Sequence, residues 1–560
     1  MYMRRLFYLI AVTLILLTAC TRSEEEDIPV GPTATVSSLF VAPDNVRPPT
    51  RDTAIADEIA VTRPTVDASQ ENLDSLVIHV DTAESRRPIS QDIYGVSGTN
   101  SNGNAELRPT LESWGGNPST RFNWRIGNAW NTGSDWFYNN VNYDLEGNVF
   151  DLFFADKLAQ GMATRVAVPT LGWVAKNSDP ETCSFPDENG NCTDGQASDC
   201  ENQLVVADPT LTSVRSTPAD IIAWLNHMRT LGGVPTYIAM DNEPELWGYT
   251  HYDVHPDCPG YGEILDKYIE YSTALRDVVP ESMLTGPVTC CYWYYWNSAA
   301  GAADKISYGN ADFIPWFLRS LAEHDAEAGQ RHLDLLDIHY YPEGLYNDDA
   351  DTFTAAHRLR ATRSLWDWQY VDESWINEPI ALIPQMLEII DENYPGTRLA
   401  ISEWNFGADE TMNGALAIAD VLGIFGREGV TMAAYWRILE AGIPGNFAFR
   451  MYTNYDGAGS RFGDLSVQAF SPDPDMVSSF AALDSDSGDL HLMLINKMPS
   501  TAQSITLELE HFTPTAGATL YRYGNGQSGQ IVSEALVNLD DLVLPPYSIT
   551  LLVIPGAEQE

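Results

Sequence analysis

The chain has 560 residues, enough for more than one domain with a large apolar core. Its 31 Lys and Arg residues are outnumbered by 78 Asp and Glu residues, so its formal net charge is −47. A surface this negative repels phosphate backbones and argues against nucleic acid as a partner, whereas an uncharged, hydroxyl-rich ligand meets no such repulsion.

Residues 1–20 have the pattern of a lipoprotein signal peptide. Two arginines precede an apolar stretch that ends in small residues and is too short to span a bilayer comfortably. The sequence LTAC, ending at Cys20, resembles the lipobox of bacterial lipoproteins, which implies that Cys20 is lipidated after cleavage. We therefore expect export and lipid anchoring at the outer membrane or cell surface, with the lipid as the membrane contact. A buried helix is the alternative interpretation.

Residues 21–74 are rich in Thr, Pro, Val, Asp and Glu and show no sustained hydrophobic period. This composition is typical of a disordered linker, which here would tether the folded part to the lipid. Order is expected to begin at LDSLVIHVD, a short strand-like run around Leu76, Ile78 and Val80.

Residues 91–449 alternate strand-like runs with amphipathic helical segments. Eight such alternations predict an α/β fold, a (β/α)8 TIM barrel that forms the catalytic domain. In this fold, functional residues collect at the C-terminal ends of the strands. The eight strand-like runs are DIYGVSG, LESWGGN, RVAVPTLGWVA, TYIAMDNEP, SMLTGPVTCC, LDLLDIHYYPE, RLAISEWNFG and VTMAAYWRILE.

After residue 450 the pattern changes to short runs with alternating faces, such as LHLMLIN, SITLELE and YSITLLVI, separated by Gly, Pro, Asn and Ser. This pattern predicts an additional antiparallel β-sandwich domain over residues 450–560. The strand near the start of the ordered chain falls outside the barrel, so we assign residues 75–90 to the same sandwich.

Six cysteines remain after the predicted lipidation site, and an even number in an exported chain indicates disulfides. Cys183 and Cys192 flank a loop rich in Gly and Asn that a bond could close. The sequence does not choose among the other pairings. Those considered are Cys200 with Cys258, and Cys290 with Cys291, of which the last two could also stay reduced.

The tripeptide Asn-Glu-Pro occurs twice, around Glu243 and around Glu378. The first copy follows the strand-like run TYIAM, so Glu243 is expected at the mouth of the barrel. The second copy follows no strand and precedes a segment with helical spacing. Pro379 at a first helical position is typical of a helix start, and we interpret Glu378 as structural.

A second acidic residue, Glu403, ends the strand-like run RLAISEW, three β/α units after Glu243. Strands four and seven lie across one barrel mouth from each other, so the two carboxyls are expected to face each other. Glycoside hydrolysis uses two carboxyl groups: one gives a proton to the leaving oxygen, and the other attacks the sugar or activates water. The pair therefore predicts a glycosidase, with a solvated acid at a strand end as the alternative for Glu403.

Four segments, MDNEPELW, DIHYYPEG, ISEWNFG and WGGNPSTRFNW, resemble the signatures of glycoside hydrolase family 44. The resemblance implies a retaining endo-β-1,4-glucanase or xyloglucanase that acts by double displacement, with Glu243 as general acid/base and Glu403 as nucleophile. Glu243 would then have to hold a proton near neutral pH, which the nearby charge of Glu403 and partial burial favour. No metal or other cofactor is expected to be required.

Residues near the strand ends are candidates for binding substrate or assisting the carboxyls. Asn242 could hydrogen-bond the sugar 2-hydroxyl. His339 or Tyr341 could donate to Glu403 and keep it ionised, although His339 could instead be a core histidine. Arg121 could offer Glu403 a fixed positive charge, or it could form a structural ion pair.

Aromatic residues in or near the strand-end loops predict a long cleft that suits internal cleavage of a polymer. Trp436 ends strand eight and could form the floor of the cleavage point. Each of the others could equally belong to the core. These others are Trp124, Trp130, Trp136, Trp173, Tyr292 and Trp293.

The loop PDENGNCTDGQASDC carries Asp187, Asp194 and Asp199, whose oxygens could hold a structural calcium ion. A solvated acidic loop is the simpler interpretation, and the spacing of an EF-hand is missing from this loop.

Other functions remain open at this point. A related barrel glycosidase acting on mannan, xylan or an arabinose-containing chain would use the same two carboxyls. A non-hydrolytic, surface glycan-binding lipoprotein is the alternative outside the enzymes, although the presence of both carboxyls argues against it. We expect a plant-type polysaccharide as the substrate and a monomer as the active form.

Overall fold

The structure is a computed structural model. It describes residues 75–97, 105–130, 138–141, 143, 147–193, 207–348, 351–436, 439–525, 529–536, 538–539 and 542–556. The predicted signal peptide with Cys20 and the predicted linker at 21–74 lie outside these residues. None of the helices within the described ranges combines the length and the apolar run that a bilayer crossing requires.

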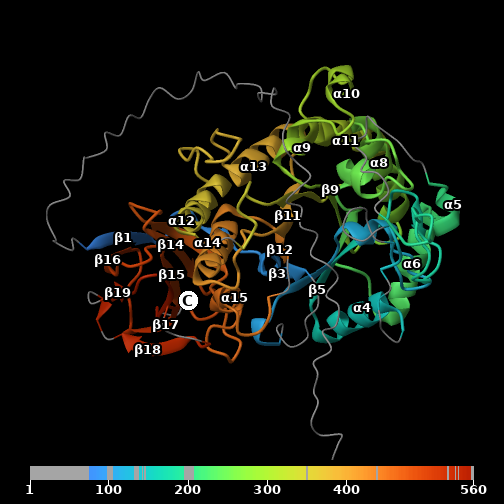
Figure 1. Cartoon of the computed structure of the whole chain (residues 1–560). Helices are drawn as coiled ribbons and strands as arrows, with labels where there is room; N and C mark the ends of the chain where they lie inside the picture. The colour runs from blue at the N-terminus through green and yellow to red at the C-terminus, as the bar shows by residue number, and fades with distance from the viewer. Residues whose placement is uncertain are drawn as a thin grey trace, which may run out of the picture. The chain divides into compact units, whose positions relative to one another are not determined.

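Eight parallel strands close into a barrel in the ring order β10-β11-β12-β3-β4-β5-β8-β9 (Figure 1). Each of the eight predicted runs contributes one strand, which confirms the TIM-barrel prediction. Nearly all residues of these strands are buried, because side chains fill the inside of the barrel and helices cover its outer face. The strands are β3 (Gly95–Ser97), β4 (Leu111–Trp114), β5 (Ala163–Val168), β8 (Tyr237–Met240), β9 (Met283–Thr289), β10 (Leu335–Tyr340), β11 (Arg398–Trp404) and β12 (Met432–Trp436).

The helices around the barrel begin and end at local signals. Helix α6 starts at Pro218, after Thr217, whose backbone N–H donates to the carboxylate of Asp220. Helix α4 ends at Gly161, which has a φ of 67°. The α-helices are α4 (Val149–Gln160), α5 (Pro209–Thr212), α6 (Pro218–Leu231), α7 (Trp247–Thr250), α8 (Tyr261–Arg276), α9 (Tyr292–Trp296), α10 (Ala302–Ser307), α11 (Phe313–Ala328), α12 (Thr352–Ala361), α13 (Leu382–Asn393), α14 (Met412–Glu428) and α15 (Pro444–Thr453). The 3-10 helices are η2 (Gln91–Ile93), η3 (Asn117–Arg121), η4 (Pro244–Leu246) and η5 (Thr362–Leu365). A small antiparallel pair is formed by β6 (Trp173–Ala175) and β7 (Ser213–Arg215).

Strand pairing is irregular at the C-terminal ends of three neighbouring barrel strands. Between β10 and β11 the register skips Ser402, so that His339 pairs with Glu403. Between β9 and β10 it skips Val288, which has a φ of 65°. Bulges of this kind re-aim side chains at barrel rims. Here they bring His339 and Glu403 side by side at the end of the barrel where function is expected.

Apart from β6 and β7, the strands outside the barrel form a ten-stranded sheet in the order β18-β17-β20-β15-β14-β13-β1-β16-β19, with β2 (Arg87–Pro88) beside β13. Strand β1 (Leu76–Asp81) lies between β13 and β16, and Figure 1 shows it in blue among strands from the far end of the chain. Strands β1 and β16 run parallel, whereas the other described strand pairs of this sheet are antiparallel. The remaining strands are β13 (Leu465–Phe470), β14 (Val477–Leu483), β15 (Leu490–Asn496), β16 (Gln503–Glu510), β17 (Ala518–Gly524), β18 (Val532–Leu536), β19 (Leu542–Leu544) and β20 (Ser548–Ile554).

Strands β14, β15 and β20 are buried on both faces. On one face, Leu492 packs in a core with Ile78 and Leu544 from the other half of the sheet, the arrangement expected of a sandwich. On the other face, Phe480 packs against α14, where a Cβ on Gly423 would lie 2.3 Å from its ring. Helix α14 is therefore buried from Asn413 to Gly426.

A buried ion pair joins the sheet to α14. The Nζ atom of Lys497 lies 2.6 Å from Oδ2 of Asp420, and the two side chains are 1% and 2% exposed. The hydroxyl of Thr362 donates to the same carboxylate oxygen at 2.6 Å. Because both charges are removed from water, each depends on the other for compensation.

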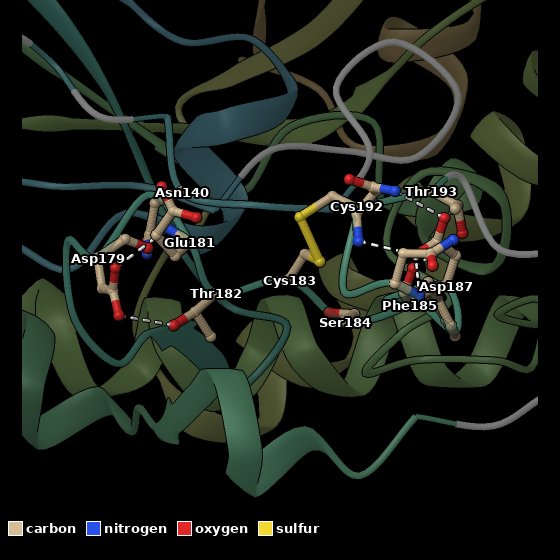
Figure 2. The surroundings of a disulfide bond; sticks show 12 residues. Asn140, Asp179, Glu181, Thr182, Cys183, Ser184, Phe185, Asp187, Cys192 and Thr193 are labelled. Atoms are coloured by element: carbon tan, nitrogen blue, oxygen red, sulfur yellow. Dashed lines mark hydrogen bonds between the residues drawn. A yellow bond between two sulfur atoms is a disulfide. The ribbon is translucent and has the colours of Figure 1, made fainter.

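A disulfide joins Cys183 and Cys192 and closes the loop between them, as Figure 2 shows. Asp187 lies in this loop, where its carboxylate accepts hydrogen bonds from the backbone N–H groups of Asn189 and Asn191. These contacts shape the turn, while the other two acids of the proposed calcium loop, Asp194 and Asp199, lie outside the described residues.

The other described cysteines are also oxidised. Cys290 and Cys291, which follow β9, are bonded to each other. Cys258 is disulfide-bonded as well, and its predicted partner Cys200 lies outside the described residues.

The second Asn-Glu-Pro copy is not a helix start. Pro379 forms an isolated β-bridge with Val371, and the carbonyl of Glu378 accepts from the backbone N–H of Asp372. Helix α13 begins three residues later, because Ala381 has a φ of 40° and interrupts the helical path before it. The prediction that Pro379 occupies the first helical position is therefore wrong.

Candidate active site

Glu243 lies just beyond strand β8, at the C-terminal end of the barrel. Its backbone is in the left-handed region, with φ 45° and ψ 58°, and its N–H donates to the carbonyl of Val288 at 3.0 Å. The residue is 7% exposed. A residue that is not glycine keeps such a conformation only where its surroundings fix it, which is common at functional sites.

Asp241 fixes the segment that carries Glu243. Its buried carboxylate accepts hydrogen bonds from the hydroxyl of Thr120 at 2.6 Å and from the backbone N–H groups of Thr170 and Leu171. The indole N–H of Trp247 donates to it as well, at 3.3 Å. This one side chain therefore ties the end of β8 to the loops that follow β4 and β5.

Glu403, near the end of β11, faces Glu243 across His339. The Nδ1 atom of His339 lies 2.8 Å from Oε1 of Glu243 and 3.4 Å from Oε2 of Glu403. One carboxylate oxygen from each glutamate and this ring nitrogen all lie within 4.8 Å of one another. The structure thus brings together the two carboxyls that the sequence pairs, and it places His339 between them.

The hydroxyl of Tyr341 donates a 2.8 Å hydrogen bond to Oε2 of Glu403. Burial raises the pKa of Glu403 to about 7, and the charge of Glu243 acts in the same direction. His339, the Tyr341 hydroxyl and the Arg165 charge oppose this rise. The raised pKa brings the titration of Glu403 close to neutral pH, so its ionisation depends on these three neighbours.

His339 is fully buried, and burial alone would lower its pKa. The charge of Glu403 and the hydrogen bond with Glu243 outweigh this effect, so that the pKa of His339 is raised above its ordinary value. The imidazole therefore tends to be protonated, and it can stabilise negative charge on both carboxyls. Its carbonyl accepts a hydrogen bond from the hydroxyl of Tyr295, which helps to fix its position.

Arg165, on β5, is the buried cation of this site. Its guanidinium lies 3.3 Å from Oδ2 of Asp337 on β10 and donates to the hydroxyl of Ser113 on β4 at 3.3 Å. A Cβ on Gly115 would lie 2.8 Å from Nη1 of Arg165 and 4.0 Å from Oε1 of Glu403. The side-chain-free position of Gly115 therefore lets the guanidinium and the carboxylate approach each other.

The structure contradicts the role predicted for Arg121. This side chain is 0% exposed and pairs with Asp253 at 2.9 Å, while it also donates to the hydroxyl of Ser213. It can contact neither a substrate nor Glu403, and the alternative of a structural ion pair is correct. Arg165 was missed because an arginine inside a strand-like run gives no periodic signal of the site it faces.

Asn242 and Trp436 both contact Gly116, which lies just after β4. The Oδ1 atom of Asn242 accepts from the backbone N–H of Gly116 at 3.2 Å. Gly116 has a φ of 80°, and a Cβ there would lie 2.5 Å from the indole ring of Trp436. The half-buried ring of Trp436 therefore packs directly on the backbone of Gly116.

The other predicted aromatic residues are spread over several surroundings. Trp124 stacks on His227 and donates to the carbonyl of Asp220, so its ring lies along helix α6. Trp173 is half-buried beneath the guanidinium of Arg215, 3.8 Å from the ring centre. The remaining members are Trp130, which is fully buried in the core, Trp136, which lies outside the described residues, and Tyr292 and Trp293, which contact Trp375 edge-on.

Comparison with known proteins agrees with this geometry. The sequence pattern of glycoside hydrolase family 44 matches residues 129–344. CelM2, a bifunctional glucanase-xylanase from a metagenome library, is 33% identical with a TM-score of 0.80, over 86% of this chain and 99% of that one. A Paenibacillus polymyxa xyloglucanase of family 44 is 26% identical with a TM-score of 0.75, over 86% of this chain and 99% of that one.

Endoglucanase A of Paenibacillus lautus is 28% identical over 557 residues, which cover 90% of this chain and 76% of that protein. The two solved structures match the fold of this chain over 86% of its length. The chain belongs to glycoside hydrolase family 44 and is a glycoside hydrolase of the endoglucanase type.

Proposed function

We propose that this enzyme cleaves β-1,4-glucan backbones internally and with retention of configuration, with Glu403 as nucleophile and Glu243 as general acid/base. The supporting observation is that oxygens of Glu243 and Glu403 and the His339 nitrogen lie within 4.8 Å of one another. Retaining glycosidases hold their carboxyl groups about 5–5.5 Å apart, whereas inverting enzymes keep about 6.5–9.5 Å to admit a water molecule.

In the first step, Glu403 attacks the anomeric carbon while Glu243 gives its proton to the leaving oxygen. In the second step, the ionised Glu243 takes a proton from water, which attacks the same carbon and releases the sugar from Glu403. The hydrogen bond from Tyr341 favours the anion of Glu403, as the role of nucleophile requires. Both steps use only these side chains.

The proposed substrates are xyloglucan and cellulose-type glucans. The support comes from relatives described as an endoglucanase, a xyloglucanase and a glucanase-xylanase. Since one of these names includes xylan, xylan is the competing backbone, with mannan as a further alternative. Release of reducing ends from xyloglucan, carboxymethylcellulose, xylan and mannan separates these substrates, and activity confined to xylan or mannan would contradict the glucan proposal.

The mechanism is tested by two variants and a matched control. We expect Glu243→Gln and Glu403→Gln to lower polymer hydrolysis by at least about 10²-fold, since each removes a reacting group. Glu378→Gln, in the other Asn-Glu-Pro copy, should keep wild-type activity. Proton NMR of the first products should show the β-anomer. Full activity of Glu243→Gln, or an α-anomer as first product, would overturn the assignment.

We also propose that the enzyme is exported and held at the outer membrane or cell surface by lipid on Cys20, as a monomer that needs no cofactor. The disulfides of the described chain support an oxidising compartment. Replacing Cys20 by Ala should move the enzyme from the membrane fraction to the soluble fraction and abolish labelling by a fatty-acid analogue. Unchanged membrane association of that variant would contradict lipid anchoring.

A further inference from the structure

Glu245, two residues after Glu243, is a buried acid that the mechanism above does not use. It lies on the short helix η4 and is 2% exposed. One oxygen of its carboxyl accepts a hydrogen bond from the backbone N–H of Cys290, which follows strand β9. Burying a carboxyl group is costly, so this position implies a structural or functional gain from the contact.

This hydrogen bond is one of two links between the Glu243 segment and the end of β9. The backbone N–H of Glu243 donates to the carbonyl of Val288, and Glu245 receives the N–H of Cys290 two residues further on. One link is at the backbone of Glu243 itself, and the other is at the side chain of Glu245 on the short helix that follows. Leu246 then packs against Cys290 in a small apolar cluster.

The disulfide between Cys290 and Cys291 adjoins the donor of the second link. A bond between neighbouring cysteines closes a small ring that includes the peptide unit between them, so the chain just after the N–H of Cys290 loses rotational freedom. The N–H itself belongs to the preceding peptide unit and is carried by the Cα atom of this ring. The disulfide is continuous with helix α9, which starts at Tyr292.

The charge state of Glu245 suits such a link. The pKa of Glu245 is raised to about 8, mainly by burial and in smaller part by the charge of Glu243, while the hydrogen bond from Cys290 and the charge of His339 oppose the rise. The phenols of Tyr294 and Tyr295 are the other titratable groups that sense Glu245. At neutral pH the side chain is therefore mainly the neutral acid, which accepts a hydrogen bond without adding a negative charge beside Glu243.

We propose that Glu245 and the Cys290–Cys291 disulfide form a brace that positions the carboxyl of Glu243 for proton transfer. The brace consists of these three residues, and Glu245 is a positioning residue in it. The inference rests on the proposed role of Glu243 as acid/base and goes beyond it, because it assigns a function to an acid and a disulfide that take no part in bond breaking.

The test compares two substrates that differ in their need for a proton donor. Cello-oligosaccharides have a poor leaving group and need protonation, whereas 2,4-dinitrophenyl β-cellobioside releases a stable anion without it. Misplacement of a reacting group by about 1 Å can cost about 10²-fold. We therefore expect Glu245→Ala and the double variant Cys290→Ser/Cys291→Ser to lower kcat/KM on cello-oligosaccharides by about 10- to 100-fold. On the dinitrophenyl substrate, kcat/KM should change by less than about threefold, because no donor acts there.

Two controls complete the experiment. Glu245→Gln keeps an acceptor oxygen and should restore most of the cello-oligosaccharide activity, and it covers the case in which Glu245→Ala does not fold. Cys183→Ser/Cys192→Ser removes the other described disulfide and should leave the ratio of the two activities unchanged. An equal fall on both substrates, or no fall on either, would overturn the brace. Persistence of dinitrophenyl hydrolysis in Glu403→Gln would instead contradict the proposed nucleophile.

Discussion

The hydroxyl of Tyr341 and the carboxyl of Glu403 are joined by a 2.8 Å hydrogen bond, and the same oxygen of Glu403 lies 3.4 Å from His339. The bond favours the ionised carboxyl and so opposes the effect of burial, which raises the pKa of Glu403 to about 7. The two groups that flank this oxygen therefore help to keep Glu403 ionised.

Replacing Tyr341 by Phe should raise the pKa of Glu403 further, because a bond that stabilises its anion is lost. A larger fraction of Glu403 is then protonated and unable to attack, so kcat/KM on xyloglucan at neutral pH should fall by about tenfold, as a shift of one pKa unit implies. A group that must be ionised sets the acidic limb of the kcat/KM profile, so this limb should move to higher pH. Tyr346→Phe is the control, since Tyr346 packs edge-on against Tyr341 and its ring is kept. An unmoved acidic limb in Tyr341→Phe would show that the bond does not govern the ionisation of Glu403.

Arg165 and Arg121 offer a matched comparison of two fully buried arginines. Replacing Arg165 by Lys moves positive charge away from Glu403 and loses the forked contact with Asp337 and Ser113. Since the Arg165 charge opposes the raised pKa of Glu403, that pKa should rise and the acidic limb should move to higher pH.

In Arg121→Lys, the ion pair with Asp253 is weakened in the same way, so stability should fall without any shift of the limb. The measurement is kcat/KM against pH, with thermal unfolding in parallel. Equal pH profiles for the two variants would contradict the assignment of Arg165 to the site.

Gly116 is expected to tolerate no side chain. An alanine there would place its Cβ 2.5 Å from the ring of Trp436 and would keep a φ of 80°, which is strained for any residue but glycine. The ring must move, so Gly116→Ala should lower kcat/KM on xyloglucan by about tenfold or more. Gly161→Ala is the control, because its φ of 67° carries similar strain in a place where nothing lies within 4 Å. If both variants lost the same activity, the contact with Trp436 would not matter.

The Lys497–Asp420 pair should be important for stability. Lys497→Met leaves a buried carboxylate without its cation, and loss of one partner of such a pair typically costs about 3–5 kcal/mol of unfolding free energy. The double variant Lys497→Met/Asp420→Leu removes both charges and should recover at least about half of that loss. For comparison, Arg125→Met breaks the half-exposed pair with Asp220 and should change stability by less than about 1 kcal/mol. Denaturant unfolding measures all three, and a small effect of Lys497→Met would contradict the prediction.

The sequence predicts the barrel well because each of its strands is a short apolar run followed by a helical segment, and both are local patterns. Glu243, Glu403, His339 and Tyr341 could be placed at one end because they directly follow or end such runs. The order of parallel strands then determines which strand ends face each other.

What the sequence does not predict depends on contacts between distant segments. Arg165 lies inside a strand, and only the bulged register of neighbouring strands and the bare backbone of Gly115 bring it toward Glu403. Glu245 follows a proline and resembles an ordinary helix-start acid until Cys290 is seen to donate to it. The parallel pairing of β1 with β16 likewise joins residues more than 400 positions apart, with no local pattern to indicate direction.

Strand β1 is the first strand of the described fold, so under the lipid anchoring proposed above it would bear any pull from the anchor. Six of its residues pair with β16 on one side, and three of them also pair with β13 on the other. Such a pull, for example from drag on a hydrated polymer bound by the enzyme, would have to shear both strand pairings before it reached β3 and the barrel. The sheet would thus keep tension away from the reacting carboxyls.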